Sequence, residues 1–190
     1  MDYSTATAVA DEIMELYAQY GNTDYIGEPI SQIEHMCQCA ELAQKGHYDD
    51  EVILAAFFHD IGHLCEHIMD VEYMDDFGIV DHEKIGADYL SAKGFSERIT
   101  KLVASHVDAK RYLTYKKPGY FERLSEASKR TLDFQGGRMT EEEAMDFENE
   151  ELFSLYITLR GWDEMGKVPH TPLPHMEYYR QLMITHLMKN

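Results

Sequence analysis

The sequence has few cysteines, few basic residues and no long hydrophobic run. Its three cysteines are Cys37, Cys39 and Cys65. An odd number argues against a disulfide framework, and without paired CxxC motifs a zinc site is only weakly indicated. No run of about 18 apolar residues occurs, so a membrane-spanning helix is not expected. The N-terminal residues lack a basic region and an apolar stretch, which predicts no signal peptide and a cytoplasmic protein.

Basic residues are outnumbered by acidic ones. Lys and Arg together number 17, Asp and Glu 35, and the formal net charge is -18. Such a charge repels nucleic acids and anionic membranes, so neither is an expected partner. Nine of the 17 basic residues lie between Arg98 and Arg130. This run could line a pocket for a small anion or form an ordinary solvated helix face, and charge alone favours the solvated face.

Signals for strands are scarce, and apolar residues recur mostly at helical spacing. Thr140 and Glu143 form a capping box at the start of one long helix, and prolines separate that helix from the last one. No linker or internal repeat divides the chain, so residues 1–190 are expected to form one all-α domain. Helices are predicted over residues 9–20, 33–43, 51–64, 82–92, 95–111, 120–134, 140–162 and 176–188.

The adjacent pair His59 and Asp60 lies inside the most apolar of these helices. Burying an imidazole beside a carboxylate is costly unless something compensates both groups. A divalent first-row metal ion does so, because imidazole nitrogen and carboxylate oxygen are suitable ligands. Gly62 follows the pair at a position where another helix would have room to approach closely.

Other histidines recur at nearly regular distances along the chain. Asp163 follows at the end of the long helix. A single histidine on an apolar face is more often an ordinary core residue, but one imidazole from each of several helices is what a metal site in a bundle core requires. Six ligands, with Asp60 able to bridge, exceed the needs of one ion and predict two. Spacings of 24, 23 and 24 residues separate His35, His59, His82 and His106.

These residues resemble known metal-binding motifs. His35, His59-Asp60 and Asp163 resemble the motif of the HD-domain superfamily, and the two later histidines resemble the extra ligands of its dinuclear branch. Other segments resemble the mixed-valence diiron oxygenases that cleave 1-hydroxyphosphonates (the PhnZ type), and this likeness covers roughly residues 20–190. The segments and positions are Asp24–Glu28, Gln32, Glu34–His35, Phe58–His63, His82–Lys84, Gly86–Leu90, Gly94–Arg98, His106, Ala109–Leu113, Gln135–Gly137 and Trp162–Glu164.

The resemblance implies an HD-domain helical bundle with two iron ions in the Fe(II)/Fe(III) state and O2 as co-substrate. It also implies how the ligands are divided. One iron would be held by His35, His59, Asp60 and Asp163. The second would share Asp60 and be held by His82 and His106.

The resemblance further implies residues that act on the substrate. Tyr25 would be a displaceable ligand, with Glu28 as its gating partner. His63 and Lys110 would face the substrate, and their i, i+4 spacing from His59 and His106 places them on the same helix faces as these ligands. The phosphonate pocket would be completed by Ser128 and Arg160.

Two substrates of such enzymes compete as interpretations. Aromatic and acidic residues such as Glu72, Tyr73, Met74 and Phe77 are typical of a quaternary ammonium site. They favour 1-hydroxy-2-(trimethylamino)ethylphosphonate, which would give glycine betaine and phosphate. The alternative, 2-amino-1-hydroxyethylphosphonate, would give glycine. Either way the partner is a small organophosphonate, and the protein is expected to be a monomer or small homo-oligomer.

Other classes of function remain open. A metal-dependent HD phosphohydrolase would use a metal-bound water on a phosphate ester and would need no oxygen. An inositol-cleaving diiron oxygenase has similar ligands but a larger chain. A non-catalytic module stabilised by its metal would need no anion pocket.

Overall fold

The computed structural model describes residues 1–25, 27–73 and 79–189. Within these ranges the protein is all-helical, as predicted, and the extended backbone is limited to two isolated bridges. None of the described helices is both long and apolar enough to cross a lipid bilayer. The elements are α1 (Tyr3–Tyr20), α2 (Gln32–Lys45), α3 (Asp50–Phe58), the 3-10 helix η1 (Ile61–His67), α4 (His82–Ala92), α5 (Glu97–Ala104), α6 (His106–Lys116), α7 (Tyr120–Arg123), α8 (Glu126–Phe134), α9 (Glu141–Glu148), α10 (Phe153–Met165) and α11 (Met176–Lys189).

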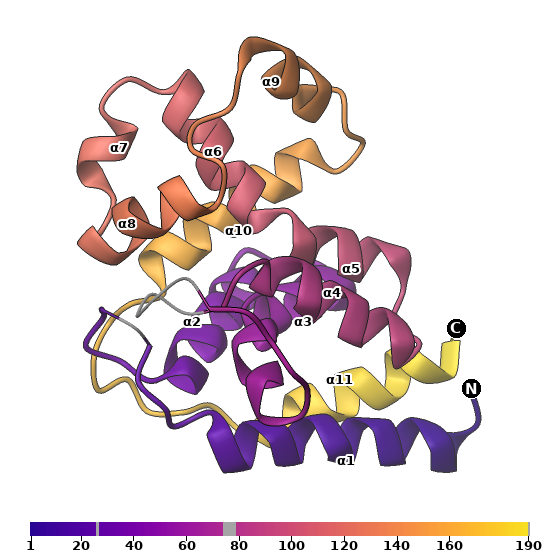
Figure 1. Ribbon diagram of the computed structural model, residues 1–190. Helices are drawn as coiled ribbons and strands as arrows, with labels where there is room; N and C mark the ends of the chain where they lie inside the picture. The colour runs from indigo at the N-terminus through magenta and orange to yellow at the C-terminus, as the bar shows by residue number, and fades with distance from the viewer. Residues whose placement is uncertain (26, 74–78, 190) are drawn as a thin grey trace.

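The helices form three groups along the molecule (Figure 1). Helices α1 and α11 lie side by side at one end and pack on each other. Helices α2 to α5 form the middle, and α6 to α9 gather at the other end. Helix α10 contacts both α2 and α6, and so joins the last group to the middle one.

Helix α3 lies at the centre of the core. Every residue from Val52 to Phe58 is buried, as its almost uniformly apolar sequence predicts. The Tyr17 hydroxyl of α1 donates to the Phe57 carbonyl at 2.8 Å, and the Phe57 ring stacks on Tyr179 of α11 at 4.4 Å. Apolar burial on all sides of α3, together with these contacts, fixes its C-terminal end, where the His59-Asp60 pair follows.

Four helices that the sequence predicts as continuous are each divided in two. Residues 51–64, 95–111, 120–134 and 140–162 break after Phe58, Ala104, Arg123 and Glu148. At the second break the Ser105 hydroxyl donates to the Leu102 carbonyl at 2.8 Å, a local bond that competes with helix continuation. Hydrophobic periodicity missed these breaks because in three of the four cases both halves turn apolar residues to the same core, whereas Tyr120 and Leu132 of the third pair are buried outside it.

Two glycines allow η1 and α4 to touch. A Cβ atom on Gly62 would lie 1.9 Å from the His82 carbonyl oxygen, and one on Gly86 would lie 3.0 Å from the Gly62 nitrogen. Backbone can approach this closely only where neither residue has a side chain. The close approach suggested by the sequence at Gly62 is therefore present, and it brings the start of α4, with His82, against the end of the α3–η1 segment.

Replacing Gly62 with Ala should destabilise the protein by about 3 kcal/mol or more, because the added methyl group collides with backbone that cannot rotate away. Gly161→Ala is the matched control: a Cβ there meets nothing within 4 Å, and alanine in a helix should stabilise by up to about 1 kcal/mol. Urea unfolding followed by circular dichroism measures both. Equal stability of the two variants would contradict the packing described here.

Candidate metal centre

Six acidic and imidazole side chains meet between the middle group of helices and the group that α10 joins to it. They come from α2, from the residues between α3 and η1, from the first residues of α4 and α6, and from α10. All six are nearly inaccessible to solvent, with at most 5% of any residue exposed. They are His35, His59, Asp60, His82, His106 and Asp163.

Four of these side chains surround one position. The Nε2 atoms of His35 and His59 are 3.1 Å apart, and Asp60 Oδ2 lies 3.4 Å and 3.3 Å from them. Asp163 Oδ1 lies 3.4 Å from His35 Nε2. Neighbouring ligand atoms of a small divalent ion, with bonds of about 2.1 Å, are separated by about 3 Å. The four side chains thus fit around a single metal ion.

A second position lies on the other side of Asp60. The Nε2 atoms of His82 and His106 are 2.9 Å apart, and Asp60 Oδ1 lies 3.4 Å and 3.3 Å from them. Asp60 therefore points one oxygen at each imidazole pair, as a carboxylate that bridges two ions does.

Two buried oxygens near these positions lack hydrogen-bond partners. They are Asp60 Oδ2 and Asp163 Oδ1. The pKa of each carboxyl group is well below its usual range, because the neighbouring histidines, and Arg160 beside Asp163, outweigh the opposing effect of burial. An ionised oxygen without a partner is costly in a protein interior. A bound cation would remove that cost, so the residues present fit a metal.

The outer nitrogens of three imidazoles contact backbone carbonyls. A carbonyl only accepts hydrogen bonds, so each Nδ1 carries the proton and each Nε2 keeps its lone pair for a metal. In the fourth imidazole, His82, Nδ1 lies 3.5 Å from a carboxylate oxygen of Glu83. The three carbonyl contacts are His35 to Gly166 at 2.9 Å, His59 to Ala56 at 2.8 Å and His106 to Val103 at 2.9 Å.

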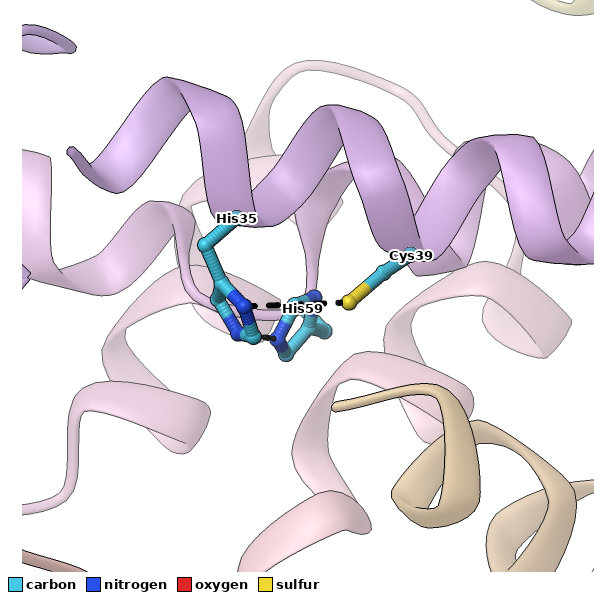
Figure 2. Close-up of side chains that lie close together, drawn as sticks. All are labelled: His35, Cys39 and His59. Carbon is cyan, nitrogen blue, oxygen red and sulfur yellow. Dashed lines mark hydrogen bonds between the residues drawn. The ribbon is translucent and has the colours of Figure 1, made fainter. Parts of the chain in front are cut away.

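Cys39 lies near the first metal position, but its thiol is next to Nδ1 of His35 and not to Nε2 (Figure 2). Its Sγ atom is 4.0 Å from His35 Nδ1, the nitrogen that faces the Gly166 carbonyl, whereas His35 meets His59 through Nε2. The thiol also contacts the Trp162 carbonyl at 3.5 Å. Although His35, Cys39 and His59 form a compact triad, the thiol does not share the metal position with the imidazoles.

A cavity of about 70 Å³ adjoins the six side chains. It contains every substrate residue that the resemblance implies, Tyr25, Glu28, His63, Lys110, Ser128 and Arg160, together with Asp60, His82, His106 and Asp163. Gln32 and Gln135 also line the cavity, and both belong to the positions that carry the resemblance, although it assigned them no role. Thr131 and Lys167 line it as well and had no signal in the sequence, because each is an ordinary polar residue that only the packing of distant segments turns toward the site.

The chain is similar to known proteins over most of its length. The HD domain family matches residues 33–148, which is more than half of the chain. An uncharacterized protein of Acanthamoeba polyphaga mimivirus is 44% identical over 94% of this chain and 81% of its own. The [1-hydroxy-2-(trimethylamino)ethyl]phosphonate dioxygenase (glycine-betaine-forming) of Leisingera caerulea is 40% identical over 84% of this chain and 80% of its own. The hydroxymethylphosphonate dioxygenase of Gimesia maris is 36% identical over 88% and 82%.

The chain is an HD-domain dioxygenase. Asp163 lies beyond the residues that the HD domain family matches, yet the fold returns it to His35 through α10.

Tyr25 of the dioxygenase covers the first metal position. Its ring stacks on His35 with 4.3 Å between centroids. Burial, followed by the charges of Asp60 and Asp163, raises the pKa of its hydroxyl well above the usual value. Glu28, predicted as its gating partner, donates its backbone N–H to the Tyr25 carbonyl at 2.9 Å, and its carboxylate accepts a hydrogen bond from Lys167 at 2.8 Å. Lys167 Nζ also lies 5.3 Å from the centroid of the Tyr25 ring, so Lys167 contacts both Glu28 and Tyr25.

Lys110 and Arg160 supply positive charge to the cavity, and they are 3% and 4% exposed. Lys110 Nζ donates to Thr131 Oγ1 at 3.0 Å and lies 3.5 Å from the Ser128 carbonyl oxygen. Burial and the nearby Arg160 lower the pKa of Lys110 to about 7. Arg160 donates through Nη1 to Asp163, while its buried Nη2 has no partner. The cavity therefore contains a guanidinium donor that an anion would satisfy.

His63 is an uncharged polar group of this cavity. Its ring stacks on His82 at 4.0 Å. Burial, together with the neighbouring His82, lowers the pKa of His63 to about 3. Its imidazole is therefore uncharged near neutral pH and available for hydrogen bonding.

Basic residues of the run from Arg98 to Arg130 lie in two different environments. Lys110 lines the cavity, whereas Arg98 pairs with Asp49 and Glu51. The remaining cations of the described cavity, Arg160 and Lys167, lie outside the run. The pocket's positive charge thus arises from distant segments, and the solvated-face interpretation holds for Arg98, which lies far from the site.

Replacing different ligands should remove different numbers of bound ions. His82→Ala should lose one of two ions, because it belongs to one pair, and Asp60→Ala should lose both, because it serves each. Cys39→Ala is the control and should retain two. Inductively coupled plasma mass spectrometry on folded, iron-loaded protein measures the content. Loss of an ion in Cys39→Ala, or full content in Asp60→Ala, would contradict the assignment.

Proposed function

We propose that this dioxygenase cleaves the carbon–phosphorus bond of a 1-hydroxyphosphonate, using two iron ions in the Fe(II)/Fe(III) state. The six converging side chains would hold the ions: His35, His59, Asp60 and Asp163 the first, and Asp60, His82 and His106 the second. The observation that carries the proposal is the Asp60 carboxylate between two imidazole pairs, beside a buried guanidinium nitrogen without a partner. The names of two relatives support the same reaction class.

The reaction balances with oxygen alone. A 1-hydroxyphosphonate and O2 give a carboxylate, phosphate and a proton. The carbon–hydrogen and carbon–phosphorus bonds at C1 break, two oxygens are added, and the substrate carbon supplies all four electrons. The bound metals would activate oxygen and act as Lewis acids toward the substrate. No external reductant or organic cofactor is required.

The chain's own residues would bind and orient the substrate. Arg160 Nη2 and Lys110 Nζ are placed to neutralise the phosphonate oxygens, and their burial strengthens that attraction relative to water. Neutral His63 can hydrogen-bond a substrate oxygen without adding charge. Ser128 contributes by holding Lys110 through its carbonyl. Fixing the anion in this way places C1 beside the metal positions.

The substituent on C1 is a separate question. The trimethylamino compound, which would give glycine betaine, is the substrate that the sequence favours and that a 40% identical relative is named for; the primary amine would give glycine. Of the residues behind that choice, Met74 and Phe77 lie outside the described residues. Glu72 and Tyr73 do not line the cavity, and the Tyr73 hydroxyl donates to Glu66 instead.

Iron-loaded protein should release phosphate from hydroxymethylphosphonate only when oxygen is present, with one O2 consumed per phosphate. An oxygen electrode and a phosphate assay measure both. A phosphate monoester serves as the control, because the phosphohydrolase alternative predicts its hydrolysis without oxygen. Phosphate release from the ester under nitrogen, with none from any 1-hydroxyphosphonate in air, would replace the proposed function with that alternative.

Replacing Tyr25 with Phe tests its proposed role as a displaceable ligand. Without the hydroxyl, the reduced iron of the resting enzyme should oxidise in air roughly tenfold faster, as a barrier lowered by about 1.4 kcal/mol allows. Mössbauer or EPR spectra recorded over time after mixing with air, without substrate, follow the oxidation. Tyr3→Phe, at an exposed position, is the control, and equal rates in all three proteins would remove the proposed role.

A further inference from the structure

The carboxylate of Glu28 already has a cationic partner within the protein. Lys167 Nζ donates to Glu28 Oε1 at 2.8 Å, and the two side chains are only 15% and 12% exposed. Glu28 lies in the loop before α2 and Lys167 just after α10, and both line the cavity. A half-buried ion pair of this kind is screened less by solvent than a surface pair. A substrate ammonium group could bind Glu28 only by displacing Lys167.

The aromatic face nearest this carboxylate is engaged by the same lysine. Lys167 Nζ lies 5.3 Å from the centroid of the Tyr25 ring, within the range of a cation–π contact. An aromatic face and a carboxylate are the groups that recognise an alkylammonium ion. Here both already contact a lysine, so neither is available to a cationic substituent.

The other charged residues of the described cavity do not offset this cation. Arg160 adds a positive charge, and Lys110 adds another when it is protonated, and both suit a phosphonate. Asp60 and Asp163 direct oxygens toward the imidazoles, and metal ions bound there would add further positive charge. Among the described lining residues, every carboxylate therefore already contacts Lys167 or points toward the imidazoles before a substrate binds.

We propose that Lys167 is a specificity-determining residue that restricts this enzyme to 1-hydroxyphosphonates without a cationic group. The substituent on C1 is then hydrogen, or an uncharged or anionic group, and ammonium substituents are excluded by the like charge of Lys167. This proposal rests on the proposed function, and it reverses the preference for a trimethylammonium substrate that the sequence suggested.

Two substrates of nearly equal size test the charge directly. 1-Hydroxypropylphosphonate and 2-amino-1-hydroxyethylphosphonate differ only by a methyl group in place of an ammonium group. Wild-type, iron-loaded enzyme should have a kcat/KM at least about tenfold higher for the propyl compound, because a like charge opposes the amine. In Lys167→Met, which frees Glu28, the ratio should shift toward the amine by at least about tenfold. Phosphate release in air gives the ratios, and calorimetric titration without oxygen gives the two dissociation constants.

Two further variants distinguish an effect of the charge of Lys167 from a general effect of substitution on the structure. Lys167→Arg keeps the cation and should retain the wild-type ratio. Lys45→Met, at an exposed position, should behave as wild type. If Lys167→Met folds poorly, the wild-type ratio together with that of Lys167→Arg still tests the proposal.

The outcomes distinguish the two levels of inference. A wild-type preference for the amine, or an unchanged ratio in Lys167→Met, would overturn the role of Lys167 while leaving carbon–phosphorus cleavage in place. Absence of oxygen-dependent phosphate release from every 1-hydroxyphosphonate would instead refute the proposed function, and the specificity proposal with it.

Discussion

The structure depends on one buried carboxylate, Asp60, which lies between two pairs of imidazoles. A carboxylate that is 2% exposed and has an oxygen without a hydrogen-bond partner is tolerated only where positive charge surrounds it. The surrounding helices are arranged to provide that environment. Helix α3 ends just before Asp60, the close contact of Gly62 with α4 brings His82 near, and α10 returns Asp163 from the far end of the chain.

The ends of two helices also orient two of the imidazoles. The last carbonyls of a helix have no partner within that helix. His59, at the end of α3, uses the Ala56 carbonyl, and His106, just after α5, uses that of Val103. In both cases the histidine bonds to the residue three positions earlier, which satisfies a free carbonyl and leaves Nε2 directed at the centre. The breaks in the helices are thus part of how the site is built.

The cavity beside the centre is lined by three basic side chains, Lys110, Arg160 and Lys167, although the protein carries a net charge of -18. Its positive charges come from α6, α10 and the segment that follows α10, and not from one basic stretch. Acidic residues dominate elsewhere, where they cap helices or form exposed pairs. Local charge in a pocket is set by which side chains the fold buries together, so the overall charge of the protein does not describe the charge of the site.

The sequence by itself determined the helical class, the His59-Asp60 pair and the regular recurrence of histidines, because hydrophobic periodicity and the cost of burying polar groups act locally. A shared Asp60 was expected from the sequence, and the fold places its two oxygens at the two imidazole pairs. Only the tertiary structure decided two features, which depend on packing between distant segments: Cys39 lies beside Nδ1 of His35, and Lys167 pairs with Glu28. The last two residues are 139 positions apart. A contact between them depends on how α10 packs against α2, and no pattern along the chain records that packing.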